Sequence, residues 1–255
     1  MHVNEKNIEF DQAGEGPPML LVHGLGGTAN FWQPVITAFA GSHSIVAPDL
    51  PSAGRSDLDN NTSIESLAAD MFALLDALNI AKVHLVGHSM GTIVCQHMAA
   101  LAPDRIVDMV LLGPLAEPPP PARSALMERA AVARSSGMTG IADTIANVAL
   151  AAATKRNKPN VQGFVREMVS RQSAEGYAVS CEALSGAARA DASKLSSRCL
   201  LITGDEDGVA PAASVRALGD ELANSETHLL NDCGHWTLTE QPEPVIELMT
   251  SFYNH

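Results

Sequence analysis

The sequence predicts an α/β fold in which a mostly parallel sheet is flanked by helices. Short apolar runs with the length of buried strands alternate along the chain with segments of helical periodicity, as a parallel sheet requires. Several of these runs end in loops rich in glycine, aspartate and histidine. Because α/β proteins hold their chemistry in loops at the carboxyl ends of the strands, we expect the functional residues in these loops.

Seven segments are expected to form strands. They are 8–10, 19–22, 44–47, 83–86, 107–112, 199–203 and 227–230. Between the third and the fourth, Thr62-x-x-Glu65 has the spacing of a capping box, and Leu67, Met71 and Leu74 follow on one face of the helix that it would begin. We expect this helix to cover the sheet and to have a structural role.

The fourth predicted strand leads directly into Gly87-His88-Ser89-Met90-Gly91. A tight turn from strand into helix requires small residues two positions before and two positions after its central serine, and it holds that serine strained and accessible. The following segment, 92–101, has apolar residues at helical spacing and stops before Pro103. The pattern predicts that Ser89 is a nucleophile.

Two later loops supply partners for this serine. Asp205 and Asp207 lie in an acidic turn after the predicted strand 199–203, and His235 follows the predicted strand 227–230. The chain order serine, acid, histidine is that of one class of triad enzymes. The alternatives are that the acidic turn is merely solvated and that His235 is an ordinary loop residue.

The loop His23-Gly24-Leu25-Gly26-Gly27 follows the predicted strand 19–22. Its flexible backbone can aim an N–H group at a reacting oxygen, so we expect the backbone amides of Leu25 and Met90 to form an oxyanion hole. A dinucleotide site is the weaker interpretation, because the glycine spacing is not G-x-G-x-x-G and Asp49 is the nearest approach to the required acidic residue.

Together these motifs resemble those of the α/β-hydrolases over essentially the whole chain. The matching stretches are 23–27, 49–56, 87–91, 204–207 and 234–235. The resemblance implies a sheet of the eight-stranded type with a helical cap, and it favours Asp207 over Asp205, because the later position of this turn usually carries the acid. Within the family, segments 134–145 and 176–184 resemble those of 3-oxoadipate enol-lactonases.

The predicted cap differs from the rest of the chain in composition and charge. The prolines at 118–121 are followed by a long stretch that is alanine-rich and helical in pattern. We therefore expect a core of residues 1–114 and 198–255, with residues 115–197 inserted as a cap. Residues 115–198 carry eleven Lys and Arg against seven acids, within a chain of net charge −13. Segment 155–158 or one of Arg123, Arg134 and Arg189 could attract a carboxylate-bearing substrate; the alternative is that these are solvated surface charges.

Composition narrows the class of protein further. The 255 residues are 46% hydrophobic, enough for one large core, while a net charge of −13 with 4% aromatic residues argues against nucleic-acid binding. The absence of a long apolar stretch or a signal-peptide pattern predicts a cytoplasmic protein with no membrane role. The four cysteines lack zinc-ligand spacing, so we expect reduced thiols, no metal and no cofactor. No pattern indicates an oligomeric state.

The function expected from these residues is that of a serine hydrolase acting on a small carboxylic ester or lactone. The triad of Ser89, His235 and Asp207 would form an acyl-enzyme. The resemblance implies an enol-lactone-like substrate, and the basic charge of the cap is consistent with an anionic one. Trp32 and Trp236, next to the catalytic loops, are expected either to line the substrate pocket or to belong to the core. Two other functions remain: hydrolysis of a carbon–carbon bond in a vinylogous diketone, or reception of a hormone-like small molecule.

Overall fold

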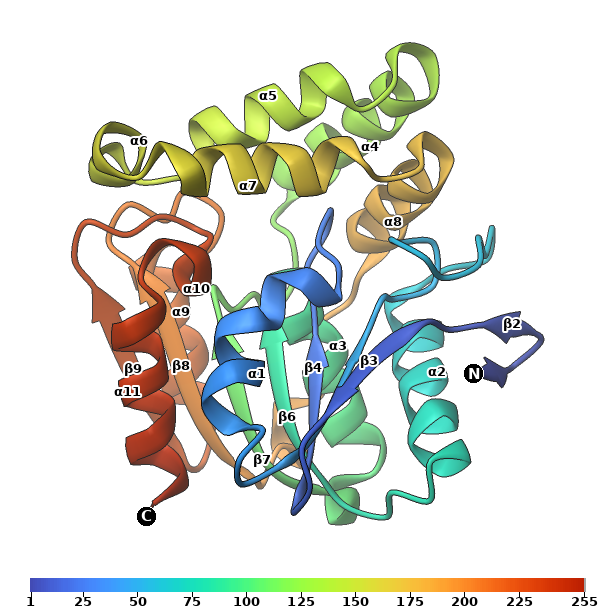
Figure 1. The fold of residues 1–255 in the computed structure, drawn as a ribbon, viewed down its shortest axis with the longest axis vertical. Helices are drawn as coiled ribbons and strands as arrows, with labels where there is room; N and C mark the ends of the chain where they lie inside the picture. The colour runs from blue at the N-terminus through green and yellow to red at the C-terminus, as the bar shows by residue number, and fades with distance from the viewer. Residues whose placement is uncertain (255) are drawn as a thin grey trace.

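The computed structural model describes residues 1–254, and one sheet of seven strands forms its centre (Figure 1). The order across the sheet is β3-β5-β4-β6-β7-β8-β9. The strands are β3 (Phe10–Ala13), β4 (Pro18–Val22), β5 (Ser44–Pro48), β6 (Val83–His88), β7 (Ile106–Leu112), β8 (Arg198–Gly204) and β9 (Ser225–Leu230). β3 pairs antiparallel with β5, and every other neighbouring pair is parallel. The predicted α/β class and mostly parallel sheet are confirmed.

The amino-terminal end differs in detail from the prediction. β1 (His2–Val3) and β2 (Lys6–Asn7) form a separate antiparallel ribbon, so within residues 1–254 the main sheet has seven strands where an eight-stranded type was expected. The predicted strand 8–10 is wrong except for its last residue. The N–H of Ile8 donates to the Met1 carbonyl (2.8 Å) and thereby closes the ribbon, and β3 begins only at Phe10.

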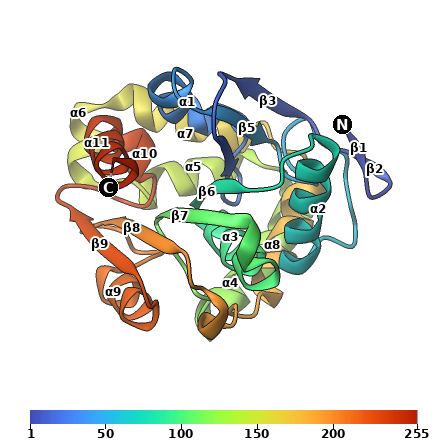
Figure 2. The same cartoon turned by 90° about the horizontal axis from the view of Figure 1, so that it is seen from below.

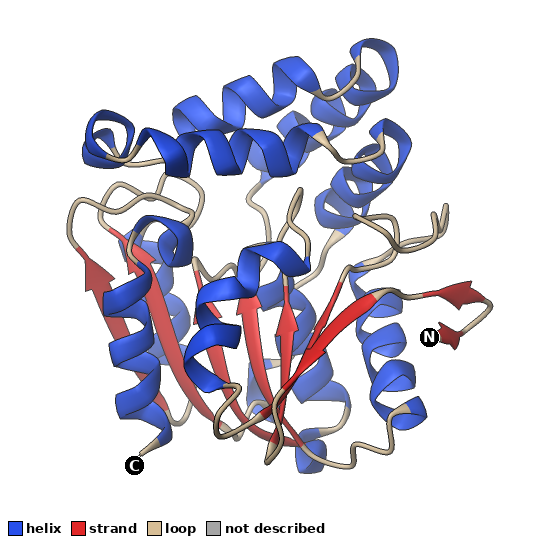
Figure 3. Cartoon of the chain, viewed as in Figure 1, coloured by secondary structure: helices blue, strands red, loops and turns tan. Residues whose placement is uncertain are grey.

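Helices cover both faces of the sheet, as Figures 2 and 3 show. α1 (Gln33–Phe39) and α11 (Pro242–Tyr253) lie on one face, and α2 (Ile64–Ala77), α3 (Met90–Leu101) and α9 (Ala212–Glu221) lie on the other. Most apolar side chains of the central strands β4, β6, β7 and β8 are buried between these layers, and Val107 at the start of β7 is exposed. Such continuous apolar strands are characteristic of parallel sheets, because both of their faces are covered.

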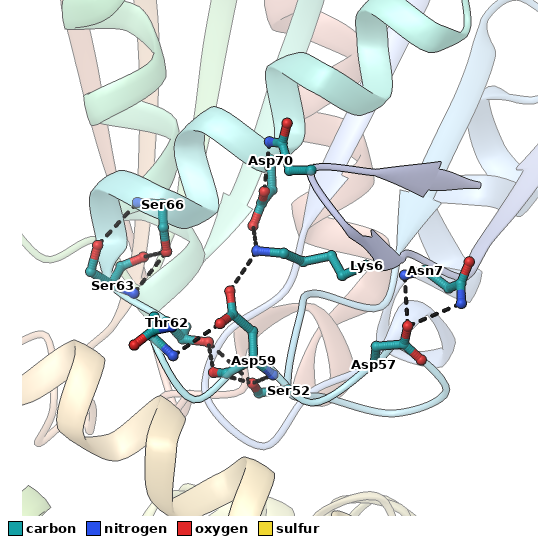
Figure 4. Close-up of polar contacts among 11 residues, drawn as sticks. Lys6, Asn7, Ser52, Asp57, Asp59, Thr62, Ser63, Ser66 and Asp70 are labelled. Carbon is teal, nitrogen blue, oxygen red and sulfur yellow. Dashed lines mark hydrogen bonds and ion pairs between the residues drawn. The ribbon is translucent and has the colours of Figure 1, made fainter.

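The helix predicted after residue 62 forms, but its capping box begins one residue later. Ser63 is the N-cap: its hydroxyl accepts from the Ser66 N–H (3.0 Å) while the Ser66 hydroxyl accepts from the Ser63 N–H (2.8 Å). Thr62 instead donates to the carbonyl of Asp59 (2.6 Å), as Figure 4 shows. The prediction of Thr62 and Glu65 as the box is therefore wrong, because the chain is still turning at Thr62.

The segment between β7 and β8 contains no strand within the described chain and forms a layer of helices above the carboxyl ends of the strands (Figure 1). These helices are α4 (Pro120–Ser136), α5 (Thr139–Val148), α6 (Ala152–Asn157), α7 (Pro159–Ser170) and α8 (Ala174–Gly186). α4 packs on α8, and α5 packs on α7. We refer to this layer, residues 115–197, as the cap, and its boundaries at 114 and 198 stay a prediction.

All four cysteines are free and buried: Cys95, Cys181, Cys199 and Cys233. Burial raises the pKa of each thiol, so each remains protonated near neutral pH. Among the helices of residues 1–254, none combines the length and apolar character needed to cross a membrane.

Candidate active site

The three predicted catalytic side chains meet above the carboxyl ends of the strands. The hydroxyl of Ser89 lies 2.8 Å from Nε2 of His235, and Nδ1 of His235 lies 2.8 Å from a carboxylate oxygen of Asp207. Because the ionised carboxylate can only accept a hydrogen bond, the Nδ1–H of His235 donates to it. Nε2 then carries no proton and can accept the hydrogen bond of the serine hydroxyl. The three residues therefore form one continuous hydrogen-bonded relay.

Ser89 occupies the strained turn that its sequence context predicts. Its φ of 52° is positive, and it lies between the end of β6 and the first residue of α3. A Cβ placed on Gly91 would lie 2.1 Å from the Val22 carbonyl oxygen, and one placed on Gly87 would lie 2.8 Å from the Gly91 carbonyl oxygen. Only glycine fits at both positions, and this close packing fixes the turn that presents the serine.

Asp207 rather than Asp205 stands behind the histidine. Its second carboxylate oxygen accepts the N–H groups of Val209 and Ala210, each at 2.8 Å. Burial acts to raise the pKa of this carboxyl, but the charge and hydrogen bond of His235 and the two N–H groups lower it to about 2. Asp205 instead accepts from the N–H of Cys233 (3.2 Å) and so shapes the loop before the histidine.

The glycine-rich loop 23–27 lies against the serine. A Cβ on Gly24 would be 2.8 Å from that of Ser89, which places the loop next to this serine. His23 fixes the loop: its Nδ1 donates to the carbonyl of Gly24 (2.8 Å) and its Nε2 accepts from the N–H of Leu50 (2.9 Å). Leu25 follows in this loop and Met90 directly follows the serine, so both predicted oxyanion donors come from segments that adjoin Ser89.

Asp49 has a structural task in this region. Its carboxylate accepts hydrogen bonds from the N–H of Ala29 (2.7 Å) and from Nε of Arg55 (2.8 Å). In a dinucleotide site the acidic residue would instead accept from the ribose hydroxyl. This arrangement does not support the dinucleotide interpretation of the loop.

An aromatic cluster lies next to His235 and contains both predicted tryptophans. Phe31 contacts the rings of Trp32, Trp236 and His88, with centroid distances of 4.8, 5.7 and 4.5 Å. Both tryptophans are buried, and neither indole nitrogen has a hydrogen-bond partner within residues 1–254. Their packing is that of core residues next to the site, and their role in substrate binding stays a prediction.

His88 belongs to the same cluster and contacts the backbone of His235. Its Nε2 donates to the backbone carbonyl of His235 (3.0 Å). Burial and the nearby charge of His235 lower the pKa of His88 to about 3, so this ring is neutral at physiological pH. A neutral His88 adds no positive charge next to the catalytic imidazole.

Two side chains that the sequence analysis missed join the cap to the catalytic loops. The amide nitrogen of Gln172, in the link between α7 and α8, donates to the carbonyls of Gly26 (3.3 Å) and Gly27 (3.4 Å), and its oxygen accepts from the N–H of Gly54 (3.1 Å). Glu240, in α10 (Thr237–Glu240), bonds both to the cap and to the loop of His235. A glutamine and a glutamate carry no sequence pattern that distinguishes them from surface residues.

The structure gives most of the predicted cap cations partners of their own. Arg123 pairs with Glu117, Arg134 with Glu175 and Glu182, and Arg189 with Glu221. In segment 155–158, Lys155 and Lys158 donate to backbone carbonyls, and Arg156 is exposed. The three arginines proposed from the sequence are therefore not free to bind a substrate carboxylate.

Arg129 of α4 is different. It is partly buried and pairs with no carboxylate within residues 1–254. It lies one helical turn after Leu126 and directly before Ala130, both of which are buried, in a helix that packs against α8. Burial and the neighbouring Cys181 raise the pKa of the Tyr177 hydroxyl, and the positive charge of Arg129 opposes this rise. Arg129 therefore lies near Tyr177. The ring of Tyr177 in turn packs against Gly26 in the glycine-rich loop.

Comparison with known proteins identifies the family. Residues 17–242 match the family model described as alpha/beta hydrolase fold. The chain is 35% identical over 112 residues to the protein RutD of Azorhizobium caulinodans, and this match spans 44% of the chain and only 42% of that protein. It is 29% identical to 3-oxoadipate enol-lactonase 2 of Acinetobacter baylyi, over 92% of the chain and 87% of that protein.

A solved structure gives the same result. The enol-lactonase from Burkholderia xenovorans LB400 superposes with a TM-score of 0.94 at 27% identity, covering 99% of this chain and 98% of that one. The resemblance to 3-oxoadipate enol-lactonases is thus confirmed, and these relatives support a hydrolase. With the matched family model covering most of its length, the chain belongs to the alpha/beta hydrolase fold family.

Proposed function

We propose that this protein hydrolyses a carboxylic ester or lactone through an acyl-enzyme on Ser89. The observation that carries the proposal is the unbroken relay from Ser89 through His235 to Asp207, with both contacts at 2.8 Å. Names of related proteins add support, since two of those described above are enol-lactonases.

The reaction would run in two halves. As the Ser89 oxygen attacks the carbonyl carbon, its proton passes to Nε2 of His235, and the backbone amides of Leu25 and Met90 stabilise the oxyanion. When the bond to the leaving oxygen breaks, that oxygen takes the proton from His235. Water then gives a proton to Nε2 of His235 as it attacks the acyl carbon. When the bond from that carbon to the Ser89 oxygen breaks, the serine oxygen takes the proton back from His235 and the acid product is released.

A lactone presents one further problem, because its leaving oxygen stays tethered to the acyl group and can attack it again. An enol leaving group removes this difficulty, since it tautomerises to a ketone that is no longer nucleophilic. The triad would therefore hydrolyse an enol-lactone with little loss to ring closure, and no cofactor takes part in these steps.

We further propose that the substrate is an anion and that Arg129 binds its carboxylate. Support comes from the pairing pattern of the cap, in which Arg123, Arg134 and Arg189 already hold carboxylates of the protein while Arg129 holds none within the described chain. A guanidinium that is partly shielded from water attracts a carboxylate more strongly than an exposed one does.

Labelling with a serine-directed fluorophosphonate, followed by kinetics on a panel of substrates, tests the proposal. We expect stoichiometric labelling of Ser89 and fast turnover of an enol-lactone or an aryl ester. Turnover of a vinylogous diketone in preference to both would assign carbon–carbon bond hydrolysis instead. Binding of a small molecule with no fast turnover of any substrate would indicate a receptor.

The charge of the substrate is tested by Arg129→Met on a pair of substrates that differ only in a carboxylate and its methyl ester. We expect KM for the anionic substrate to rise about tenfold, because one charge-assisted contact is lost, and KM for the neutral ester to stay within about twofold. Arg166→Met is the matched control, because Arg166 is an exposed cap arginine that already pairs with Asp143. Equal changes for the two substrates would rule out a role of Arg129 in charge recognition.

A further inference from the structure

Glu240 is a fully buried acidic residue that the proposed reaction does not use. It ends the short helix α10, which begins two residues after His235. One carboxylate oxygen accepts the N–H of Gly234 (3.0 Å), and the other accepts the N–H of Ala151 (2.8 Å) and the hydroxyl of Thr154 (2.7 Å). All three partners are donors, as a carboxylate requires.

These contacts join two regions that are distant in sequence. Gly234 directly precedes the catalytic histidine, whereas Ala151 and Thr154 belong to the cap, at the start of α6. A second bond runs beside the first, because the N–H of His235 donates to the carbonyl of Ala149 (2.9 Å). The cap segment 149–154 and the histidine loop are therefore held together at the residues that set the position of the imidazole.

The two segments also touch without space between them. A Cβ on Gly234 would lie 2.7 Å from the Ala149 oxygen and the Ala151 nitrogen, and 2.8 Å from a carboxylate oxygen of Glu240. A shift of the cap segment must therefore be passed to the loop of His235, since close-packed groups have no room to absorb it. A displacement of about 1 Å in a catalytic group costs on the order of a hundredfold in rate.

We propose that Glu240 is a positioning residue that holds the imidazole of His235 in line with Ser89 by tying its loop to cap segment 149–154. This inference rests on the proposed function, because it concerns how the triad of that reaction is aligned. The Ser89–His235 contact then depends on the seating of the cap, and a change on the cap side alone alters the reactivity of the serine.

The isosteric variant Glu240→Gln separates the two sides of this junction. Its single acceptor oxygen is drawn to the side with two donors, Ala151 and Thr154, so its NH2 group faces the N–H of Gly234 and weakens the hold on the histidine loop. Thr154→Val removes one donor from the cap side and leaves the histidine loop itself unchanged. Glu206→Gln is the matched control, because Glu206 accepts the N–H of Ala152 in the same segment (2.9 Å) and is exposed.

The readouts are kcat and KM, the fluorophosphonate labelling rate of Ser89, and the low-field proton resonance of the His235–Asp207 bond, all measured well below the melting temperature of each variant. We expect Glu240→Gln to lower kcat and the labelling rate about tenfold with KM within about twofold, and to broaden or shift the resonance. Thr154→Val should lower the labelling rate about threefold, and Glu206→Gln should leave it unchanged.

A wild-type labelling rate and resonance in Glu240→Gln, with only the melting temperature lowered, would overturn the inference and assign Glu240 a purely structural role. If Glu240→Gln does not fold, Thr154→Val decides, and a wild-type labelling rate there is likewise a refutation. Failure of the proposed function looks different, because wild-type protein would then show no Ser89-dependent turnover at all.

Discussion

Two histidine–aspartate pairs with almost the same geometry lie at opposite ends of the sheet. His235 and Asp207 meet at 2.8 Å beyond the carboxyl ends of the strands, and His84 of β6 meets Asp108 of β7 at 2.9 Å near their amino ends. Both pairs are largely shielded from water. The pairing of imidazole and carboxylate therefore does not by itself distinguish a catalytic site.

What distinguishes the two ends is the surroundings of the second ring nitrogen. Nε2 of His235 faces the strained Ser89, next to the glycine-rich loop 23–27. The ring of His84 instead packs edge-on against the rings of His43 and Tyr253, at 5.5 Å each, and no hydroxyl bonds to its Nε2 in residues 1–254. The comparison teaches that the two pairs differ in the partner of the second ring nitrogen, which is a serine hydroxyl in a strained turn only at the carboxyl ends of the strands within residues 1–254.

The largest expected effect follows from removing the Ser89 hydroxyl, which faces Nε2 of His235 and has no counterpart beside His84 in the described residues. We expect Ser89→Ala to lower kcat by at least about a thousandfold, because no nucleophile remains for His235 to activate. Circular dichroism should show an unchanged fold. Turnover close to that of the wild type would refute the catalytic assignment of this serine.

The same substitution made in both pairs tests the comparison directly. Asp207→Asn should lower kcat on the order of a thousandfold or more, since the amide no longer holds the tautomer in which Nε2 can accept a proton. Asp108→Asn should change kcat by less than about twofold. Steady-state kinetics of the two purified variants is sufficient, and a large loss in Asp108→Asn would break the distinction between the two ends.

A smaller effect concerns acid stability. The pKa of His88 is lowered to about 3 in the folded protein, below its ordinary value of 6.5. The unfolded chain therefore binds a proton that the folded chain does not, so this stability is fully present above pH 6.5 and is lost as the pH falls toward 3. The loss is about 1.4 kcal/mol for each pH unit.

Urea unfolding at pH 7, 6 and 5 measures this dependence. We expect His88→Gln, whose amide can still donate to the His235 carbonyl, to flatten the fall in the free energy of unfolding. His43→Gln, at the other end of the sheet, should flatten it less, because His43 is more exposed. An identical slope in wild type and His88→Gln would show that His88 is not the source.

The sequence predicted the parts of this molecule that are encoded by consecutive residues. The strands after the first, the turn around Ser89 and the loops of Asp207 and His235 are local patterns, and the parallel topology brings their ends to one edge. Gln172 and Glu240 could not be found in this way, because their cap and core partners are 86 to 146 residues away and are set only when the cap packs. The ion pairs of Arg134 and Arg189, whose partners are 32 to 48 residues away, were missed for the same reason.

The smaller errors have similar causes. The capping box was displaced by one residue because Thr62 and Ser63 are both good N-caps, and the choice depends on the turn at Asp59. The strand at 8–10 was misplaced because Ile8 is buried but its backbone N–H bonds to Met1 rather than to a strand of the sheet. In both cases short-range chemistry allowed two solutions, and tertiary contacts selected one.

The burial of all four thiols has a practical consequence for the study of the cap. Reagents that attack thiolates should leave the protein untouched, because no accessible sulfur is present in its ionised form. A cysteine placed at Val148, which is 71% exposed at the end of α5, would then be the preferred attachment point for a fluorescent dye in an otherwise unaltered chain. Fluorescence from a dye at this position would report whether the cap moves during turnover.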